Sequence, residues 1–185
     1  MVIIKTVSNI IAELEAKGSK VRLRAAGRKG VDFFSFQGIA LEQKVSDLSS
    51  APEYDRAAEF INNVVEDFKN EVTDKVVVVY NGFLNMLTQE IRVRELLPIS
   101  LEAVEIKDTD SMLNIEPEDD EDEVLNELTE KYIDFNMYYA LIDSLAAEHS
   151  ARMQAMEAAT KNAKEKVDSL TVEYNKARQA AITTE

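Results

Sequence analysis

Cysteine, tryptophan and histidine are almost missing from this chain of 185 residues, which contains no Cys, no Trp and one His. Without cysteine the chain can form no disulfide framework, no thiolate zinc site and no thiol nucleophile. A histidine metal site or a Ser-His-Asp triad would depend entirely on His149. We therefore interpret His149 as a packing or interface residue, and we expect no metal, no cofactor and no catalytic residue.

Glycine and proline are also scarce, with five and three residues, and their positions divide the chain. All the glycines lie in the first 82 residues, and the last proline is Pro117. The absence of helix breakers from Glu118 to Glu185 predicts one long helix after an α/β domain in residues 1–117. At ~1.5 Å per residue this helix would be about 100 Å long, so we expect part of it to project from the domain.

Positive charge is in short supply, because 21 Lys and Arg face 35 Asp and Glu and give a formal net charge of −14. Most of such a surface repels a phosphate polymer, which argues against a dedicated nucleic-acid-binding protein. The sequence also lacks an apolar run of the roughly 20 residues that a membrane-spanning helix needs. Hydrophobic residues still make up 45% of the chain, which is enough for a folded core.

Hydrophobic spacing in the first 100 residues predicts a mixed α/β domain, with a small Rossmann-like sheet and flanking helices. Steps of three and four predict helices, alternation predicts half-buried strands, and a β-branched run is typical of a central strand covered on both faces. The expected helices are 2–17, a short turn at 28–36, and one that Pro52 opens and that reaches Val72; the expected strands are 20–26, 76–80 and 90–97.

Asn81-Gly82 could form a two-residue hairpin turn. Because apolar residues continue beyond Gly82, we instead expect a long strand with Gly82 as a bulge. The chain would then reverse at the more polar Thr88-Gln89, and the two strands would pair antiparallel at one edge of the sheet.

The second half of the expected long helix carries a regular apolar pattern, with inner residues at alternating steps of four and three. A strict repeat of seven predicts a left-handed coiled coil, and the many small residues would let a partner backbone come close. We call this set the seam: His149, Met153, Met156, Thr160, Ala163, Val167, Leu170, Tyr174, Ala177 and Ala181.

No other stretch of the sequence is both long enough and regular enough to cover the seam. An isolated helix cannot bury its apolar stripe, and helices in proteins are stabilised mostly by such burial. We therefore expect a partner that is another polypeptide, a second copy of the chain, or a part of the same protein absent from this sequence.

The C-terminal residues Val172–Glu185 (VEYNKARQAAITTE) resemble the signature near the C-terminus of the gamma subunit of F-type ATP synthase. Ser150–Ala163 resembles a helical motif of the same family, and both Val77–Asn81 and Gly27–Gly30 fit it. The family begins with a long N-terminal helix, a first strand and a Gly-rich turn, and it continues beyond the position of Glu185. The resemblance thus implies a chain truncated at both ends, with 118–185 as half of an antiparallel coiled coil.

The resemblance also implies a mechanical function as the central-stalk rotor of the ATP synthase. In this family the non-catalytic gamma subunit transmits torque between a proton-driven membrane ring and the catalytic subunits, coupling ATP synthesis to proton transport. The implied partners are the alpha and beta subunits, the epsilon subunit, the membrane ring of c subunits and the chain's own N-terminal helix. The implied location is the cytoplasmic face of the bacterial inner membrane, as a peripheral subunit.

Particular residues can be assigned to partners only through this resemblance. Helix positions that contact the surrounding subunits correspond to Glu148, Arg152, Arg178, Gln179 and Thr183. The stretch Leu113–Pro117, which includes Ile115 and Glu116, matches the foot near epsilon and the membrane ring.

The residues by themselves allow a second function, a coiled-coil adaptor whose α/β domain binds a small ligand and whose helix self-associates. A hydrolase or transferase has less support, because the chain offers no credible pair of nucleophile and base. Gly27–Gly30 could cradle a phosphate but lacks the known phosphate-loop spacings, which favours a tight turn. The acidic run Glu116–Glu123 could bind calcium, but without a Gly turn it favours a helix N-terminus. Four strand arginines could form a docking patch or ordinary solvated faces: Arg22, Arg24, Arg92 and Arg94.

Overall fold

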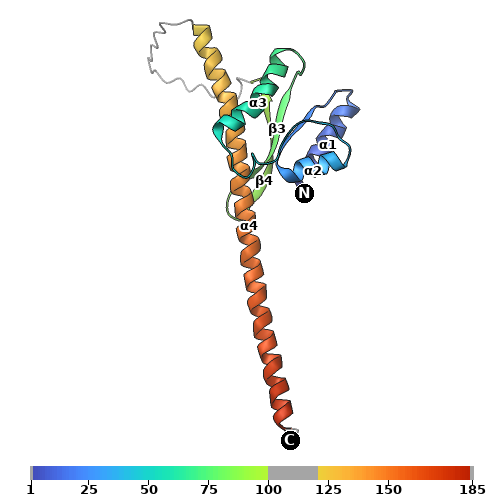
Figure 1. Ribbon diagram of the computed structural model, residues 1–185, viewed down its shortest axis with the longest axis vertical. Coiled ribbons are helices and arrows are strands. Elements are labelled where there is room, and N and C mark those ends of the chain that lie inside the picture. Colours follow the sequence, from blue (N-terminus) through green and yellow to red (C-terminus); the bar gives the residue numbers. More distant parts are fainter. Residues whose placement is uncertain (1, 100–120, 184–185) are drawn as a thin grey trace.

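The computed structural model describes residues 2–99 and 121–183, which form a small α/β domain and one very long helix (Figure 1). The helix runs past the domain on one side and then projects far beyond it. The elements in chain order are α1 (Val2–Ala16), β1 (Leu23–Ala26), α2 (Arg28–Phe36), β2 (Leu41–Val45), α3 (Tyr54–Lys69), β3 (Val76–Phe83), β4 (Gln89–Leu97) and α4 (Glu121–Thr183).

The predicted class, mixed α/β with a long C-terminal helix, is confirmed, but the strands form two separate two-stranded sheets. β1 pairs parallel with β2, and β3 pairs antiparallel with β4. The strand β2, in which half-buried and exposed residues alternate, was not predicted from the sequence. The expectation that β3 is covered on both faces is wrong, because Val77 is 37% exposed. A β-branched run favours a strand, but it does not decide how many layers cover that strand.

The hairpin between β3 and β4 reverses between Phe83 and Gln89, close to the expected place. The side-chain oxygen of Asn85 accepts the N–H groups of Leu87 (2.9 Å) and Thr88 (2.8 Å), which closes the turn. Gly82 lies inside β3 opposite Glu90 and is not a bulge, since the register shift falls at Val76/Val77.

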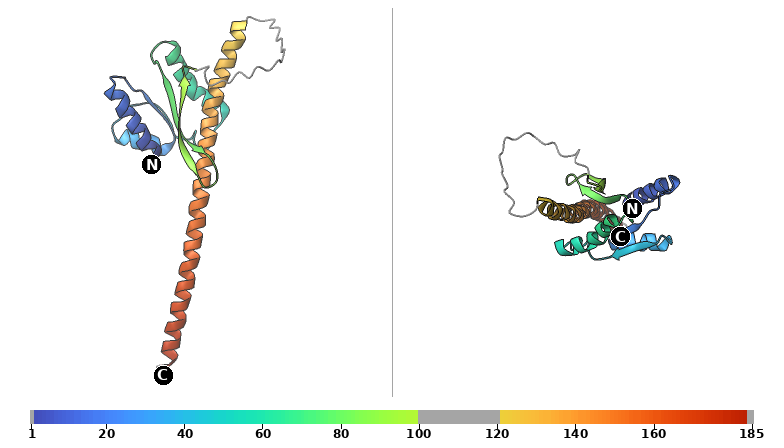
Figure 2. Two further views of the ribbon diagram at one scale, coloured as in Figure 1. Left: turned by 180° about the vertical axis from the view of Figure 1, so that it is seen from behind. Right: turned by 90° about the horizontal axis from the view of Figure 1, so that it is seen from above.

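The hydrophobic core lies where α3, α4 and the ends of β3 and β4 meet. It explains why α3 is strongly amphipathic, because Ala57, Phe60, Ile61 and Val65 share its inner face. Figure 2 shows α3 and the hairpin beside the first half of α4. The buried cluster consists of Leu48, Ala57, Phe60, Ile61, Val65, Leu96, Leu97, Ile133, Met137 and Leu141.

The helix predicted after Pro117 is present as α4, which is described from Glu121 onward. Its first half packs against α3 and β3, whereas every described residue from Ala155 to Thr183 is exposed. Within the described ranges, no helix combines the length and the apolar character needed to cross a bilayer. Because the exposed half of α4 extends far beyond the domain (Figure 1), the expected projection of the helix is confirmed.

Candidate functional site

The seam lies uncovered along the projecting half of α4. Its large side chains face solvent, with Met156 65%, Val167 61%, Leu170 49% and Tyr174 66% exposed. Burying such side chains is worth about 25 cal/mol per Å² of apolar surface, so the seam favours association with a partner. The alanine and threonine side chains of the seam are small, so the backbone of a second helix can pack close to α4 there.

The uncovered apolar face does not begin at His149, as the sequence pattern had suggested, but continues toward the start of α4. We call the exposed apolar residues before Ala146 the proximal strip. They follow the same alternating steps of four and three as the seam, and Ala146 connects the strip to the seam at His149. The members of the strip are exposed by 41–65%: Leu128, Tyr132, Phe135, Tyr139 and Ile142.

The opposite face of the same helical segment is buried in the core. Ile133, Met137 and Leu141 are 3%, 5% and 6% exposed, so α4 is apolar on two sides in this region. The regular spacing of the proximal strip was visible in the sequence. It could not be separated from the core-facing residues, because periodicity does not say which apolar face the domain covers.

The partner-contact residues implied by the resemblance lie on exposed parts of α4. Glu148 Oε1 and Arg152 Nη2 form an ion pair of 2.6 Å across one helical turn, and both side chains are more than half exposed. His149 Nδ1 lies 3.4 Å from Arg152 Nη1. An exposed ion pair at this spacing contributes about 0.3–0.5 kcal/mol to stability. Breaking it so that either side chain can contact a partner therefore costs little.

Arg178, Gln179 and Thr183 lie near the far end of α4 and are all exposed. Thr183 Oγ1 donates a hydrogen bond of 2.8 Å to the backbone oxygen of Gln179, within the helix. Ile115 and Glu116 lie outside the described residues, as does most of the acidic run.

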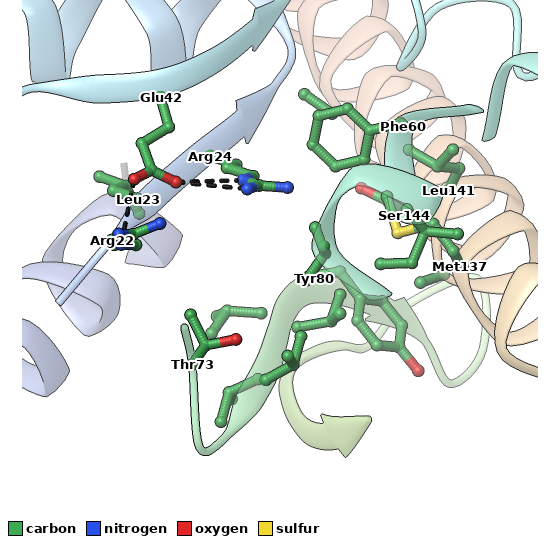
Figure 3. A pocket seen from close by; sticks show the side chains of 18 of the residues that line it. Arg22, Leu23, Arg24, Glu42, Phe60, Thr73, Tyr80, Met137, Leu141 and Ser144 are labelled. Carbon is green, nitrogen blue, oxygen red and sulfur yellow. Dashed lines mark hydrogen bonds and ion pairs between the residues drawn. The ribbon is translucent and has the colours of Figure 1, made fainter. Parts of the chain in front are cut away.

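A cavity of about 310 Å³ lies between the two sheets (Figure 3). Consecutive residues of β3, Val76–Tyr80, line one wall, so the cavity runs along the backbone edge of that strand. Arg22–Arg24 before and within β1 line the other side, and Phe60 and Leu141 add an apolar wall. This is the feature of the structure that suits the small-ligand alternative.

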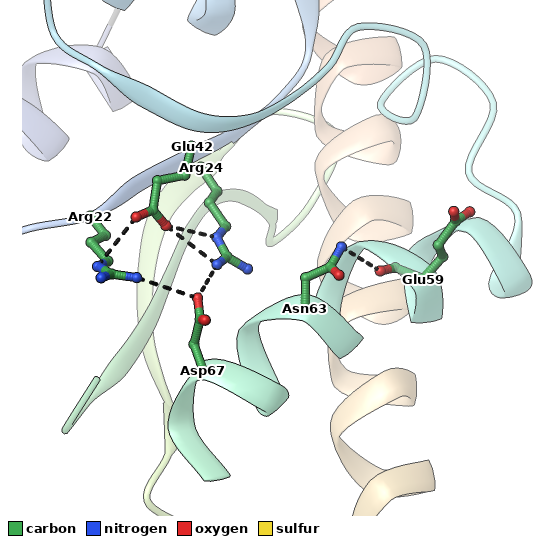
Figure 4. A network of polar contacts seen from close by, with 6 residues as sticks. All are labelled: Arg22, Arg24, Glu42, Glu59, Asn63 and Asp67. Carbon is green, nitrogen blue, oxygen red and sulfur yellow. Dashed lines mark hydrogen bonds and ion pairs between the residues drawn. The ribbon is translucent and has the colours of Figure 1, made fainter. Parts of the chain in front are cut away.

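The four strand arginines divide between two sets of partners and do not form one docking patch. Arg22 and Arg24 both pair with Glu42 and Asp67 at the rim of the cavity (Figure 4), including an Arg22 Nε to Glu42 Oε1 distance of 3.2 Å. The other two face α4. Arg92 pairs with Glu90 and Asp143, and Arg94 donates to Asn136.

Gly27 supports the tight-turn interpretation of Gly27–Gly30. Its φ of 121° lies in a region that favours glycine, and a Cβ there would lie 3.1 Å from Ser49 Oγ. Among residues 2–99 and 121–183, no group of three or more His, Asp or Glu side chains could hold a metal ion.

Two carboxyl groups beside α3 have shifted pKa values. Lys69 Nζ lies 2.5 Å from Glu130 Oε1, and this hydrogen bond lowers the pKa of Glu130. Burial raises the pKa of Asp134, which is 7% exposed. The ionised form is thus favoured at Glu130 and disfavoured at Asp134, one helical turn away.

Comparison with known proteins gives this arrangement a family context. The family model described as ATP synthase matches residues 1–185. The ATP synthase gamma chain of Aliarcobacter butzleri is 85% identical over 185 residues, which are 100% of this chain and 63% of that protein. The gamma chain of Wolinella succinogenes is 59% identical over 182 residues, which are 98% of this chain and 61% of that one. This chain therefore spans less than two thirds of the length of these relatives.

The fold is also found among solved structures. The central stalk and c ring of the Tetrahymena thermophila mitochondrial ATP synthase contains a chain that aligns with a TM-score of 0.62 at 22% identity, over 85% of this chain and 69% of that one. At this level of identity the likeness concerns the fold alone. The family match over all 185 residues, together with the identity to the bacterial relatives, shows that the chain belongs to the gamma-chain family of ATP synthases.

Proposed function

We propose that the chain is part of the central-stalk rotor of an F-type ATP synthase. In this function it transmits torque between a proton-driven membrane ring and catalytic alpha and beta subunits, so that ATP synthesis is coupled to proton transport. The observation that carries the proposal is the projecting half of α4, whose apolar seam the described residues leave open in a chain of this family. The chain itself is non-catalytic, and nucleotide chemistry belongs to the subunits around it.

The occupant of the seam in this proposal is a second helix running antiparallel to α4. The small residues of the seam permit close packing, and a closely packed pair of helices resists bending and twisting better than a single helix. The larger side chains of the proximal strip, such as Phe135, require a wider separation or smaller facing residues. We accordingly propose that residues 118–185 are one half of a coiled coil and that residues 1–117 are the α/β domain that carries it.

The partners in this proposal are the alpha, beta and epsilon subunits and the membrane ring of c subunits. Glu148 and Arg152 lie near the middle of α4, and Arg178, Gln179 and Thr183 lie near its far end, where we propose that they contact the alpha and beta subunits. Ile115 and Glu116 contact epsilon or the membrane ring. We propose a peripheral location on the cytoplasmic face of the inner membrane, because the relatives named above are bacterial ATP synthase gamma chains.

A helix-addition experiment tests the occupant of the seam. The probe is a peptide with the N-terminal helix of the gamma chain from Aliarcobacter butzleri, and a peptide of scrambled order is the control. The native peptide should raise both the helical circular dichroism of the mixture and the melting temperature, because it buries the seam. A native peptide that performs no better than the scrambled one contradicts the proposal.

Oligomeric state and ligand response separate the rotor from the adaptor alternative. The adaptor predicts a stable dimer whose melting temperature rises with a small ligand in the cavity between the sheets. The rotor predicts co-purification with alpha, beta and epsilon subunits and no catalytic-type ATP site on this chain alone. Light scattering, nucleotide titration and co-expression with the three subunits distinguish these outcomes.

A further inference from the structure

One face of α4 holds the hairpin formed by β3 and β4. Asp143, Ala147, Ser150 and Gln154 follow one another at steps of four, three and four, so they lie along the same side of the helix. Ala147 is fully buried, with 0% of its surface exposed. This face of α4 is therefore covered at Ala147, between Asp143 and Ser150.

Asp143 connects this face of α4 to both strands of the hairpin. Its Oδ1 accepts the backbone N–H of Phe83 at 3.1 Å, and its Oδ2 lies 3.0 Å from Arg92 Nη1. Phe83 ends β3 and Arg92 belongs to β4, so one carboxylate ties the two strands together. The Asp143 side chain is 9% exposed, which strengthens the ion pair relative to one in water.

Arg92 reaches Asp143 by crossing over Gly82 on the neighbouring strand. A Cβ at Gly82 would lie 2.6 Å from Arg92 Nε, so the path of the arginine requires glycine there. Arg92 Nε also donates to Glu90 at 2.8 Å. The hydrogen bond to Glu90, with smaller contributions from Tyr80 and Asp143, raises the pKa of Arg92, so the guanidinium stays charged.

The tip of the hairpin is held by two more residues of the same face. Ser150 Oγ donates to the backbone oxygen of Met86 at 2.8 Å, and Gln154 Nε2 donates to the same oxygen. Every described residue of α4 beyond Gln154 is exposed. The tip is therefore attached at the point where the helix leaves the domain.

We infer that Asp143, Ser150 and Gln154, with Arg92 and the Met86 carbonyl, form a latch that fixes the rotational position of the projecting helix relative to the β3–β4 hairpin. Apolar side chains alone would allow α4 to slide or roll against the hairpin, whereas directional hydrogen bonds and a largely buried ion pair select one position. In the rotor, torque passes between the domain and the helix through this latch. That consequence rests on the proposed function, but the latch itself is a property of the chain.

Distance measurements between two spin labels test the latch. The chain has no cysteine, so Leu87→Cys on the hairpin tip and Lys161→Cys on the projecting helix give two unique labels. Two latch variants are compared with this labelled parent: Asp143→Asn, and Ser150→Ala with Gln154→Ala. Glu130→Gln is the matched control, because it removes a carboxylate that joins α4 to the domain at an exposed site.

The latch variants should broaden the distance distribution about twofold or more, while the control keeps the parent's width. Amide exchange at Phe83 should accelerate roughly tenfold or more in Asp143→Asn, since a hydrogen bond to a charged, buried acceptor is weakened. If Asp143→Asn fails to fold, the Ser150 and Gln154 variant still tests the latch, because it changes only contacts with the tip. Distributions as narrow as the parent's in a folded variant overturn the latch.

The consequence for torque is tested in an ATP synthase complex assembled with the same variants. A looser latch should lower the protons pumped per ATP hydrolysed by about twofold or more, with the hydrolysis rate maintained. Unchanged coupling in a variant whose distance distribution is broad overturns the role of the latch in torque. Failure of the parent chain to assemble with the other subunits would instead contradict the proposed function and leave the latch standing.

Discussion

Gly82 shows how one residue in a regular strand can be dictated by a neighbour on the next strand. No positive φ requires glycine at this position, and its place in β3 opposite Glu90 is regular. The reason for glycine is the side chain of Arg92, which occupies the volume where a Cβ would lie. A glycine inside a strand is therefore informative about a close approach, and here it points to the arginine that reaches α4.

Gly82→Ala should lower the free energy of unfolding by about 1–3 kcal/mol, because the added methyl group forces the Arg92 side chain to move. Chemical denaturation measures the change. The matched control is Gly30→Ala inside α2, where nothing lies within 4 Å of the new Cβ, and alanine there should be neutral or stabilising by about 0.5–1 kcal/mol. An equal response at both glycines would contradict the close approach of Arg92.

Asp134→Asn should raise the free energy of unfolding at pH 7. Burial raises the pKa of Asp134 in the folded protein, so the folded state binds its proton more tightly than the unfolded state does. The wild-type protein therefore loses stability as the pH rises from the unfolded pKa, about 3.9, through the folded pKa. Denaturation curves should show a higher free energy of unfolding for Asp134→Asn than for wild type at neutral pH, and no difference below about pH 3.9. A difference that stays constant with pH would exclude burial of the Asp134 carboxylate as its cause.

At the scale of the element, α4 changes its character along its length. Beside the domain it has a buried face and an open face, and beyond Gln154 every described residue is exposed. Its apolar residues therefore have two different effects. Those facing α3 and β3 stabilise this chain, whereas those of the seam can stabilise only a complex.

Leu141→Ala and Leu170→Ala should separate these two effects. Leu141 is 6% exposed, and its truncation should cost about 2–5 kcal/mol of stability. Leu170 is 49% exposed, and its truncation should change the stability of the chain alone by less than about 0.5 kcal/mol. Leu170→Ala should also weaken the binding of the N-terminal helix peptide to this chain, and calorimetry measures that affinity. Unchanged peptide binding would argue that the peptide does not use the seam.

The residues that the structure describes divide into a packed part and an exposed part, the second being the projecting half of α4 from Ala155 to Thr183. The core holds α3, α4 and the hairpin together, while the projecting half of α4 depends on its own backbone hydrogen bonds. Such a region opens locally with a much smaller free energy than a packed one. The molecule is therefore expected to be stable at one end and dynamic at the other until a partner covers the seam.

Hydrogen exchange should reveal this division directly. Amides at residues 133–147 of α4 should exchange roughly a hundredfold or more slowly than those at 160–180, since only the former lie in a packed segment. Mass spectrometry of peptic fragments resolves the two regions. Addition of the partner helix should slow the outer region selectively, and uniform exchange along α4 would contradict the division.

Local patterns in the sequence were sufficient to predict α4, β3 and the seam. The absence of Gly and Pro after Pro117 predicts α4, and the β-branched run at Val76–Val79 predicts β3. The seam follows from its spacing, because side chains that recur every three or four residues share one helical face whatever the rest of the chain does. The short strand β2 was missed because five residues of weak alternation do not stand out from a loop.

Tertiary structure alone decided which of these surfaces are covered. The hydrogen bond between Phe83 and Asp143 joins residues 60 positions apart, and no local pattern relates two such residues. The open face of α4 around Phe135 and the buried face around Met137 carry similar apolar residues in the sequence. They differ only because α3 and the hairpin pack on one of them, and that choice depends on the path of the whole chain through space.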